Sequence, residues 1–179
     1  MKKGFTLIEL LIVIGILAIL AVAAVLVLNP AEILRQARDS QRISDLSSVK
    51  SAIALYFSTV TSTPTIAAAG PFSTGMTDCA WGTGGCTVRN ITTVDGNGWV
   101  PIDLRKTSGG SPLGSLPIDP SNSTTVSSTQ YGFKGDTTAL TFKLTTFLES
   151  VKYSPKMATD GGSNSNSTST YEVGTNLAL

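Results

Sequence analysis

The sequence contains no histidine, few charged residues and only two cysteines, and each shortage excludes a class of function. Without histidine there is no Ser-His or Cys-His catalytic couple and no mixed Cys-His zinc site. Charged residues make up 14% of the 179 positions and the formal net charge is +1, so no strong field attracts nucleic acid or an anionic surface. We therefore expect no enzymatic activity, no cofactor and no metal site, and no nucleic-acid partner is evident.

The remaining polar motifs do not suggest catalysis either. The glycine-rich stretches GTGG and SGGSPLG lack the lysine and the spacing of a phosphate-binding loop. The aspartates at 103, 119, 136 and 160 are scattered, and three of them stand beside proline or glycine. Turn formation explains those three without a catalytic role.

The two cysteines, Cys79 and Cys86, lie in DCAWGTGGC. Their CxxxxxxC spacing is typical neither of a zinc site nor of a redox-active CxxC pair. In an exported domain this spacing favours a disulfide. Closing so short a loop contributes roughly 2.5 kcal/mol in the chain-entropy model.

The N-terminus has a different character from the rest of the chain. The basic leader Met1–Gly4 is followed by an apolar run from Phe5 to Leu28 with a single charge, Glu9. As a helix this run is about 36 Å long, enough to span the ~30 Å hydrocarbon core of a bilayer. The lysines at 2 and 3 should stay cytoplasmic, which directs the C-terminal part out of the cytoplasm.

Two simpler interpretations of this segment are a secretory signal peptide and a plain signal anchor. The run is longer than the usual apolar region of a signal peptide, and no good small-x-small cleavage site precedes a natural mature start. A plain anchor explains the length of the run but not Glu9. A charge at membrane depth is costly unless it finds a partner, and no basic residue lies on the membrane side to supply one. Cleavage after Gly4 would create an amine at Phe5, one helical turn from Glu9, on the same or a neighbouring chain.

The segment KGFTLIELLIVIGILAILA resembles the N-terminus of type IV prepilins and type II secretion pseudopilins. In that family a membrane aspartyl peptidase cuts after the glycine and methylates the new N-terminal residue. The resemblance assigns cleavage and N-methylation to Gly4 and Phe5, and filament assembly to Glu9. It implies as partners the membrane, the prepilin peptidase, an assembly platform with its ATPase and further copies of the chain in a homo-oligomeric filament. The precursor would be a single-pass protein of the inner (cytoplasmic) membrane with an extracytoplasmic head, and would later enter a cell-surface pilus or a pseudopilus.

Helical periodicity resumes after Asn29-Pro30, where we expect a kink at Pro30 because proline disfavours helical geometry before it. Apolar residues then recur in steps of three and four, which indicates one packed face of a helix. The charged stretch from Arg35 to Asp45 is interpreted as a solvated face or, alternatively, as a contact with neighbouring subunits or lipid headgroups. One long helix from Phe5 to Ser58 is expected, bent near Pro30. The residues of the apolar face are Leu46, Val49, Ile53, Tyr56 and Val60.

The composition changes at Thr59, and residues 59–78 are turn-rich. Short strands are predicted at 87–94 and 98–104, with turns at Asp95-Gly96 and Asn97-Gly98 between them. The clearest hairpin joins 129–135 to 138–144 through Gly135-Asp136. Its apolar face should cover the helix, giving an α+β, pilin-like fold in which a long N-terminal helix, transmembrane in its first half, packs on a small antiparallel sheet.

Two features of the head extend the resemblance. The turn LPIDPSN at 116–122 is similar to a turn that precedes the sheet in pseudopilins and Gram-positive-type pilins. In the major pseudopilins a C-terminal loop binds calcium, but here the 160–170 loop has no carboxylate after Asp160, so a flexible or filament-surface loop is favoured.

The expected organisation is a leader (1–4), a transmembrane or filament-core helix (5–28), its amphipathic continuation (29–60) and a globular head (61–179). We expect a structural subunit of a type IV pilus or a type II secretion-like pseudopilus. The cysteine loop and the missing calcium ligands favour a surface pilin, whereas the LPIDP turn favours a pseudopilin. The alternative from another class is an extracytoplasmic binding module on a single-span anchor, which needs neither cleavage nor Glu9.

Overall fold

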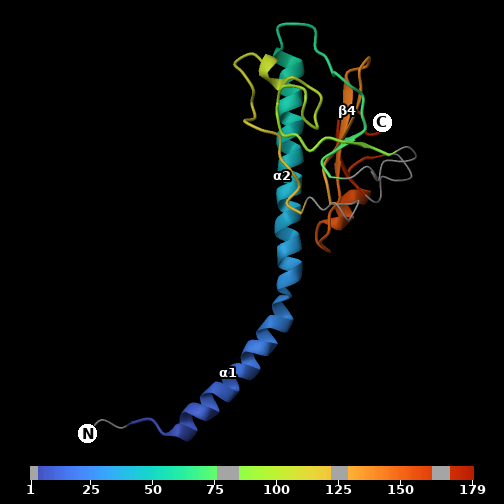
Figure 1. Cartoon of the computed structure of the whole chain (residues 1–179). Helices are drawn as coiled ribbons and strands as arrows, with labels where there is room; N and C mark the ends of the chain where they lie inside the picture. The colour runs from blue at the N-terminus through green and yellow to red at the C-terminus, as the bar shows by residue number, and fades with distance from the viewer. Residues whose placement is uncertain (1–3, 76–84, 122–128, 163–169) are drawn as a thin grey trace. The chain divides into compact units, whose positions relative to one another are not determined.

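The computed structural model describes residues 4–75, 85–121, 129–162 and 170–179, with backbone only at 26–28 (Figure 1). The chain divides into two units, Met1–Arg35 and Gln36–Leu179. The predicted boundaries at residues 4, 28 and 60 stay predictions. The second unit, called the head below, contains most of helix α2 and a five-stranded sheet.

Two helices follow one another at the N-terminus. Helix α1 (Leu7–Leu28) ends at Asn29, whose φ of 40° is left-handed, and α2 (Pro30–Thr59) begins at the next residue. Asparagine tolerates this conformation better than most residues, and proline fits the first position of a helix because it lacks an N–H to bond. The helix is therefore interrupted at the predicted place, while the kink assigned to Pro30 stays a prediction.

The sheet is mixed, which corrects the predicted antiparallel sheet. The strand order is β2-β1-β3-β4-β5, and β1 pairs with β2 in parallel while the other neighbours are antiparallel. The parallel pair is short, because only Phe72 and Ser73 of β1 pair with Thr87 and Val88 of β2. The strands are β1 (Phe72–Ser73), β2 (Thr87–Val88), β3 (Gly132–Asp136), β4 (Thr141–Thr146) and β5 (Tyr171–Gly174).

The predicted hairpin is confirmed as β3 and β4, with Phe133 opposite Leu144 and Asp136 opposite Thr141. Its turn lies two residues later than predicted, because Gly135 and Asp136 belong to β3. The Asp136 carboxylate accepts hydrogen bonds from the backbone N–H groups of Thr138 and Ala139, which fixes the turn and lowers the pKa of this carboxyl.

The strand predicted at 98–104 is wrong, and that at 87–94 is confirmed only at Thr87–Val88. Pro101 cannot donate to a ladder, and Trp99, Val100 and Ile102 are all buried, so this segment forms core and pairs only through the isolated antiparallel bridge of Asp103 with Asp95. It continues into the short helix η1 (Leu104–Lys106).

The core of the head joins α2 to the sheet and to the segment between β2 and β3, which lies around the upper part of α2 (Figure 1). The predicted helix face is confirmed at Leu46, Val49, Ile53 and Tyr56, whereas Val60 is only partly buried. An aliphatic or aromatic side chain that is fully buried contributes about 1.5–3 kcal/mol to stability. The helix residues in this core are Leu46, Val49, Ala52, Ile53 and Tyr56.

Candidate functional site

The predicted cleavage site lies on an accessible segment. Helix α1 begins at Leu7, so Gly4 and Phe5 precede it in non-helical backbone, and Phe5 is 86% exposed. A Cβ added at Gly4 would meet no atom within 4 Å. The structure of this chain therefore does not itself require glycine at position 4, and any such requirement comes from a partner.

Glu9 has local partners that the sequence reasoning missed. Its Oε2 accepts hydrogen bonds from the Thr6 backbone N–H at 2.9 Å and from the Thr6 hydroxyl at 2.8 Å. In return, the Glu9 backbone N–H donates to the Thr6 hydroxyl at 3.3 Å. This is a capping box, and the pattern Thr-x-x-Glu before an apolar run would have predicted it. Both donors belong to the neutral Thr6, whereas only a cation was expected as the partner of Glu9.

Helix α1 is apolar on all sides. Its 22 residues span about 33 Å at ~1.5 Å per residue. By length and composition it is able to cross a membrane, and its large apolar side chains are exposed within the single chain. A helix that is apolar all round is stable only when lipid or protein covers it.

The charged stretch of α2 is only in part the solvated face that was predicted. Arg42 and Asp39 are both 0% exposed, and the Arg42 guanidinium binds both oxygens of Asp119, at 2.6 and 3.0 Å. It also donates to Asp39 at 2.8 Å and to Glu149 at 3.0 Å. We call Arg42, Asp39, Asp119 and Glu149 the Arg42 cluster. It ties the LPIDP turn and the segment after β4 to the helix.

Asp39 does a second task in this cluster. Its two oxygens accept hydrogen bonds from the backbone N–H groups of Glu149 at 3.0 Å and Ser150 at 2.7 Å.

Burial alone would lower the pKa of Arg42. The hydrogen bonds and the charge of Asp119, together with the hydrogen bonds to Glu149 and Asp39, raise this pKa above its ordinary value. The guanidinium therefore stays charged in a buried position, where it is held by several hydrogen bonds.

Asp45 lies one turn further along α2 and accepts the Tyr131 hydroxyl of the sheet at 2.7 Å. Burial raises the pKa of the Asp45 carboxyl, and the nearby Asp119 charge raises it further, against the hydrogen bond from Tyr131. By contrast, Arg35 is half-exposed and forms a long 4.0 Å pair with Glu32. The charged stretch thus changes from solvated to buried along its length.

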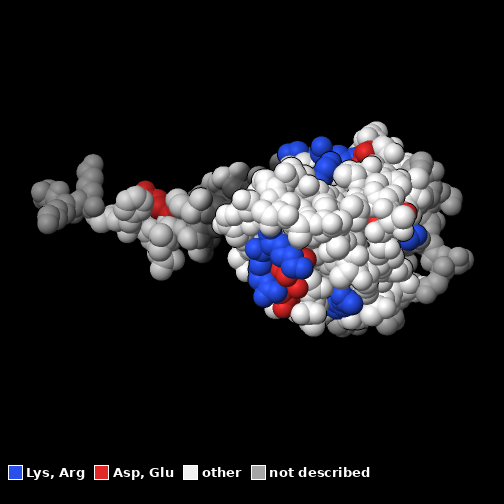
Figure 2. All heavy atoms as spheres, turned by 90° about the horizontal axis from the view of Figure 1, so that it is seen from above, with Lys and Arg blue, Asp and Glu red and all other residues white. Residues whose placement is uncertain are grey.

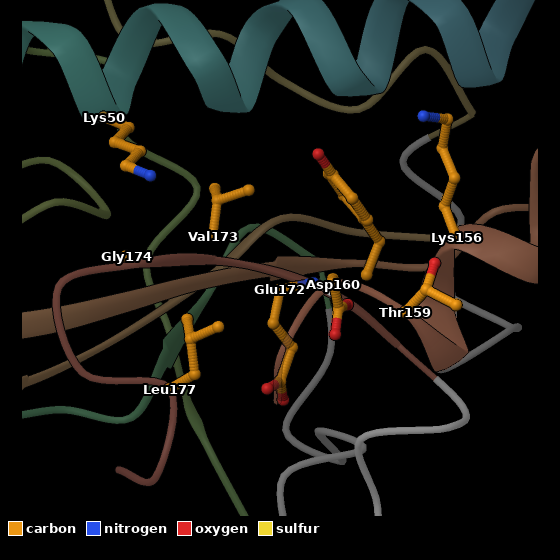
Figure 3. A pocket seen from close by; sticks show the side chains of 9 residues that line it. Lys50, Lys156, Thr159, Asp160, Glu172, Val173, Gly174 and Leu177 are labelled. Atoms are coloured by element: carbon orange, nitrogen blue, oxygen red, sulfur yellow. Dashed lines mark hydrogen bonds between the residues drawn. The ribbon is translucent and has the colours of Figure 1, made fainter. Parts of the chain in front are cut away.

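A pocket of about 240 Å³ lies along β5 and is lined by Lys50 of α2, Lys156 and Thr159 (Figure 3). Figure 3 shows Val173 pointing toward α2 and Glu172 pointing away from it. Glu172 forms a buried ion pair with Lys143 at 3.2 Å. The pocket is polar and has no arrangement of groups that indicates a reaction.

Asp160, which was considered as a calcium ligand, uses its carboxylate to hold the backbone. One oxygen accepts the N–H of Glu172 at 2.7 Å and the other accepts that of Gly162 at 3.1 Å. Among the residues that the structure describes, no group of three or more His, Cys, Asp or Glu is arranged to hold a metal ion.

The predicted disulfide is not tested. Cys86 is buried, but Cys79 lies outside the described residues, so the Cys79–Cys86 bond stays a prediction.

The charges on the face of the molecule in Figure 2 lie in small separate groups on a mostly uncharged surface.

The family model described as the prokaryotic N-terminal methylation motif matches residues 1–25. No curated protein and no solved structure matches the chain. The match covers the leader, the capping box and most of α1, and the long apolar helix with a small mixed sheet is a pilin-like α+β architecture. The N-terminus of this chain therefore carries the signature of type IV prepilins and pseudopilins, which supports a membrane-associated precursor that is processed by a prepilin peptidase.

Proposed function

We propose that this chain is the structural subunit of a type IV pilus or of a type II secretion-like pseudopilus. A membrane peptidase hydrolyses the Gly4–Phe5 peptide bond, and the new N-terminus at Phe5 is methylated. The head lies outside the cytoplasmic membrane while α1 spans it. An assembly platform and its ATPase then move the subunit from the membrane into a filament of identical chains.

The observation that carries the proposal is the single charge of α1 and its position. Glu9 lies in the first turn of the 22-residue apolar helix, five residues after the glycine of the methylation motif. An anchor gains only a helix cap from Glu9, and the charge in its apolar run opposes insertion. A filament needs it, because a carboxylate near the end of one helix can attract the amine at Phe5 of the next subunit.

Helix α1 supplies the rest of the binding energy. Its side chains are exposed in the single chain, and in a filament they would pack against the same helix of neighbouring subunits. Subunits would thus leave the bilayer without exposing apolar surface to water. The hydrophobic contribution to this packing scales with the area that is covered.

The test is the substitution Glu9→Leu in the full chain. Filaments sheared from cells and the subunit left in the membrane are both quantified by immunoblot. We expect processed Glu9→Leu subunit to accumulate in the membrane, with filaments reduced to background. Normal filament yield from this variant would contradict the assembly role of Glu9, whereas the absence of filaments from the wild-type chain would favour the anchored binding module.

A further inference from the structure

The pocket beside β5 is walled by three segments of the head that are far apart in the sequence. Lys50 of α2 lines one side, and Lys156 of the short helix η2 (Ser154–Ala158) lines another, together with Thr159 after it. Val173 of β5 forms part of the floor. Figure 3 shows Lys50 reaching from α2 toward β5 and Lys156 pointing toward α2. Two ammonium groups therefore line one cavity of about 240 Å³.

These two lysines have no acidic partner in the described part of the head. Lys50 and Lys156 are both exposed, and neither belongs to an ion pair of the described residues. The segment 163–169 contains no acidic residue in the sequence, so it offers neither lysine a carboxylate. Two like charges that line one small cavity repel each other, and an anion bound between them is attracted to both.

The two carboxylates that also line the pocket already have partners. Asp160 accepts hydrogen bonds from the backbone N–H groups of Gly162 at 3.1 Å and Glu172 at 2.7 Å. Glu172 pairs with Lys143 at 3.2 Å. Figure 3 shows both carboxylates pointing away from α2, and so away from Lys50. With Lys143, three lysines and two carboxylates surround the pocket, which leaves one positive charge unbalanced.

The charge and the size of the pocket indicate the class of ligand. One unbalanced positive charge matches a monoanion such as a carboxylate better than a phosphate dianion. The described lining residues include no arginine, whose planar fork suits phosphate. The pocket is smaller than those of drug-sized ligands, which are about 300–1,000 Å³. Its polar walls favour a small hydroxylated ligand over a fatty acid.

Tyr171 adds a neutral donor to this pocket. Its side chain is half-buried and belongs to the pocket lining. Burial, together with the charge of Asp160, raises the pKa of the Tyr171 hydroxyl above its ordinary value. The hydroxyl therefore keeps its proton at neutral pH and is able to donate a hydrogen bond to an anion.

We propose that the pocket between α2, η2 and β5 binds the carboxylate of a small hydroxylated monoanion, the chemistry of a sugar acid, through Lys50 and Lys156. This inference goes beyond the proposed function, because it concerns a ligand of the head and depends neither on cleavage nor on assembly. The competing interpretation is that both lysines are ordinary solvated residues, in which case anions would respond equally to any lysine of the surface.

The experiment titrates sodium glucuronate into the full chain in detergent micelles at low salt and measures heat by isothermal titration calorimetry. We expect a Kd on the order of 1 mM. Lys50→Gln and Lys156→Gln should each weaken binding about tenfold, as for loss of one hydrogen bond between charged groups. Lys106→Gln is the matched control, since it removes the same charge from η1, outside the pocket lining, and should leave the Kd unchanged. Circular dichroism confirms that each variant is folded.

Two further titrations test the chemistry of the ligand. Glucose has a similar ring without the carboxylate, and inorganic phosphate has charge without the ring. We expect both to bind at least about tenfold more weakly than glucuronate. The proposal would be overturned by a wild-type chain that does not bind glucuronate, by Lys50→Gln and Lys156→Gln variants that bind it normally, or by an equal loss in Lys106→Gln. Glucose or phosphate binding as tightly as glucuronate would also overturn it.

Discussion

The two units of this chain stabilise their charged groups in opposite ways. In the N-terminal unit, Glu9 is satisfied by a residue only three positions away, on an exposed helix. In the head, Arg42 is buried and its partners Asp119 and Glu149 are 77 and 107 positions away. A local pair can form in an isolated helix, whereas the Arg42 cluster exists only when the head is folded.

This difference suggests a division of tasks. The N-terminal unit keeps its apolar surface and the Glu9 carboxylate accessible, as a segment that is cut and then packed by other molecules must. The head buries the central charges of the Arg42 cluster and the Lys143–Glu172 pair, so that these contacts do not depend on outside partners. Variants in the first unit should therefore affect processing and assembly, and variants in the Arg42 cluster should affect stability.

The largest effect is expected at the cleavage site. Gly4→Val should leave the fold unchanged, because a Cβ at this position meets no atom within 4 Å, but should abolish cleavage. Immunoblots of membrane fractions would show only the longer precursor. Gly15→Val is the matched control, since position 15 of α1 is equally open, and its processing should be normal. Normal cleavage of Gly4→Val would count against the site.

The next effect is expected in the Arg42 cluster. Arg42→Met removes the cation that pairs with the buried carboxylates of Asp39 and Asp119. The negative charges of these buried groups are then no longer neutralised by Arg42. The free energy of unfolding should fall by about 3–5 kcal/mol. Thermal or denaturant unfolding of the full chain in detergent micelles, followed by tryptophan fluorescence, measures it.

Arg38→Met is the control for this prediction. The Arg38 side chain is 35% exposed and contacts Glu149 alone in this cluster, so its loss should cost less than about 1 kcal/mol. Equal losses of stability in the two variants would show that burial does not set the strength of these contacts.

A smaller effect concerns pH. The pKa of Asp45 is raised in the folded head. At a pH between the pKa of the unfolded state and that of the folded state, the folded state therefore binds more protons. The contribution of Asp45 to stability thus falls as the pH rises through this range. Asp45→Asn keeps an acceptor for Tyr131 and should raise stability at pH 7 by less than about 1 kcal/mol. The stability of Asp45→Asn relative to the wild type should then increase from pH 3 to pH 7.

Asp136 supplies a control of opposite sign. Backbone N–H groups of Ala139 and Thr138 lower its pKa, so its contribution is present at neutral pH and is lost as pH falls through the folded value. Asp136→Asn should therefore lower stability at pH 7. A loss of stability for Asp45→Asn at pH 7 would contradict the assigned sign.

The same contrast explains how much was predictable from the sequence. The cleavage motif, the apolar helix, its interruption before Pro30 and the β3–β4 hairpin depend on neighbouring residues, so local patterns indicate them. The capping box was equally local, and only the restriction to cationic partners hid it. The face of α2 at Leu46 to Tyr56 was predicted because its period is that of a helix.

The Arg42 cluster was not predictable in this way. Arg42 and Asp39 look like solvated residues, since arginine and aspartate are seldom buried without partners. Those partners come from the LPIDP turn and from the segment after β4, and only the folded head brings them together. Asp119 was assigned to turn formation, which is correct for its bond to the Ser121 N–H at 2.8 Å but incomplete. The mixed sheet was missed because β1 lies in the segment 59–78 that was predicted as a loop, so its parallel pairing with β2 was not expected.

The central claim is that the chain is cut after Gly4 so that the N-terminus of Phe5 becomes part of the assembly site. The most direct test is mass spectrometry of the N-terminal peptide of the subunit purified from membranes and from filaments. The account predicts a peptide that begins with N-methylated Phe5 in both. An intact Met1, or a first residue beyond Leu28, would contradict it.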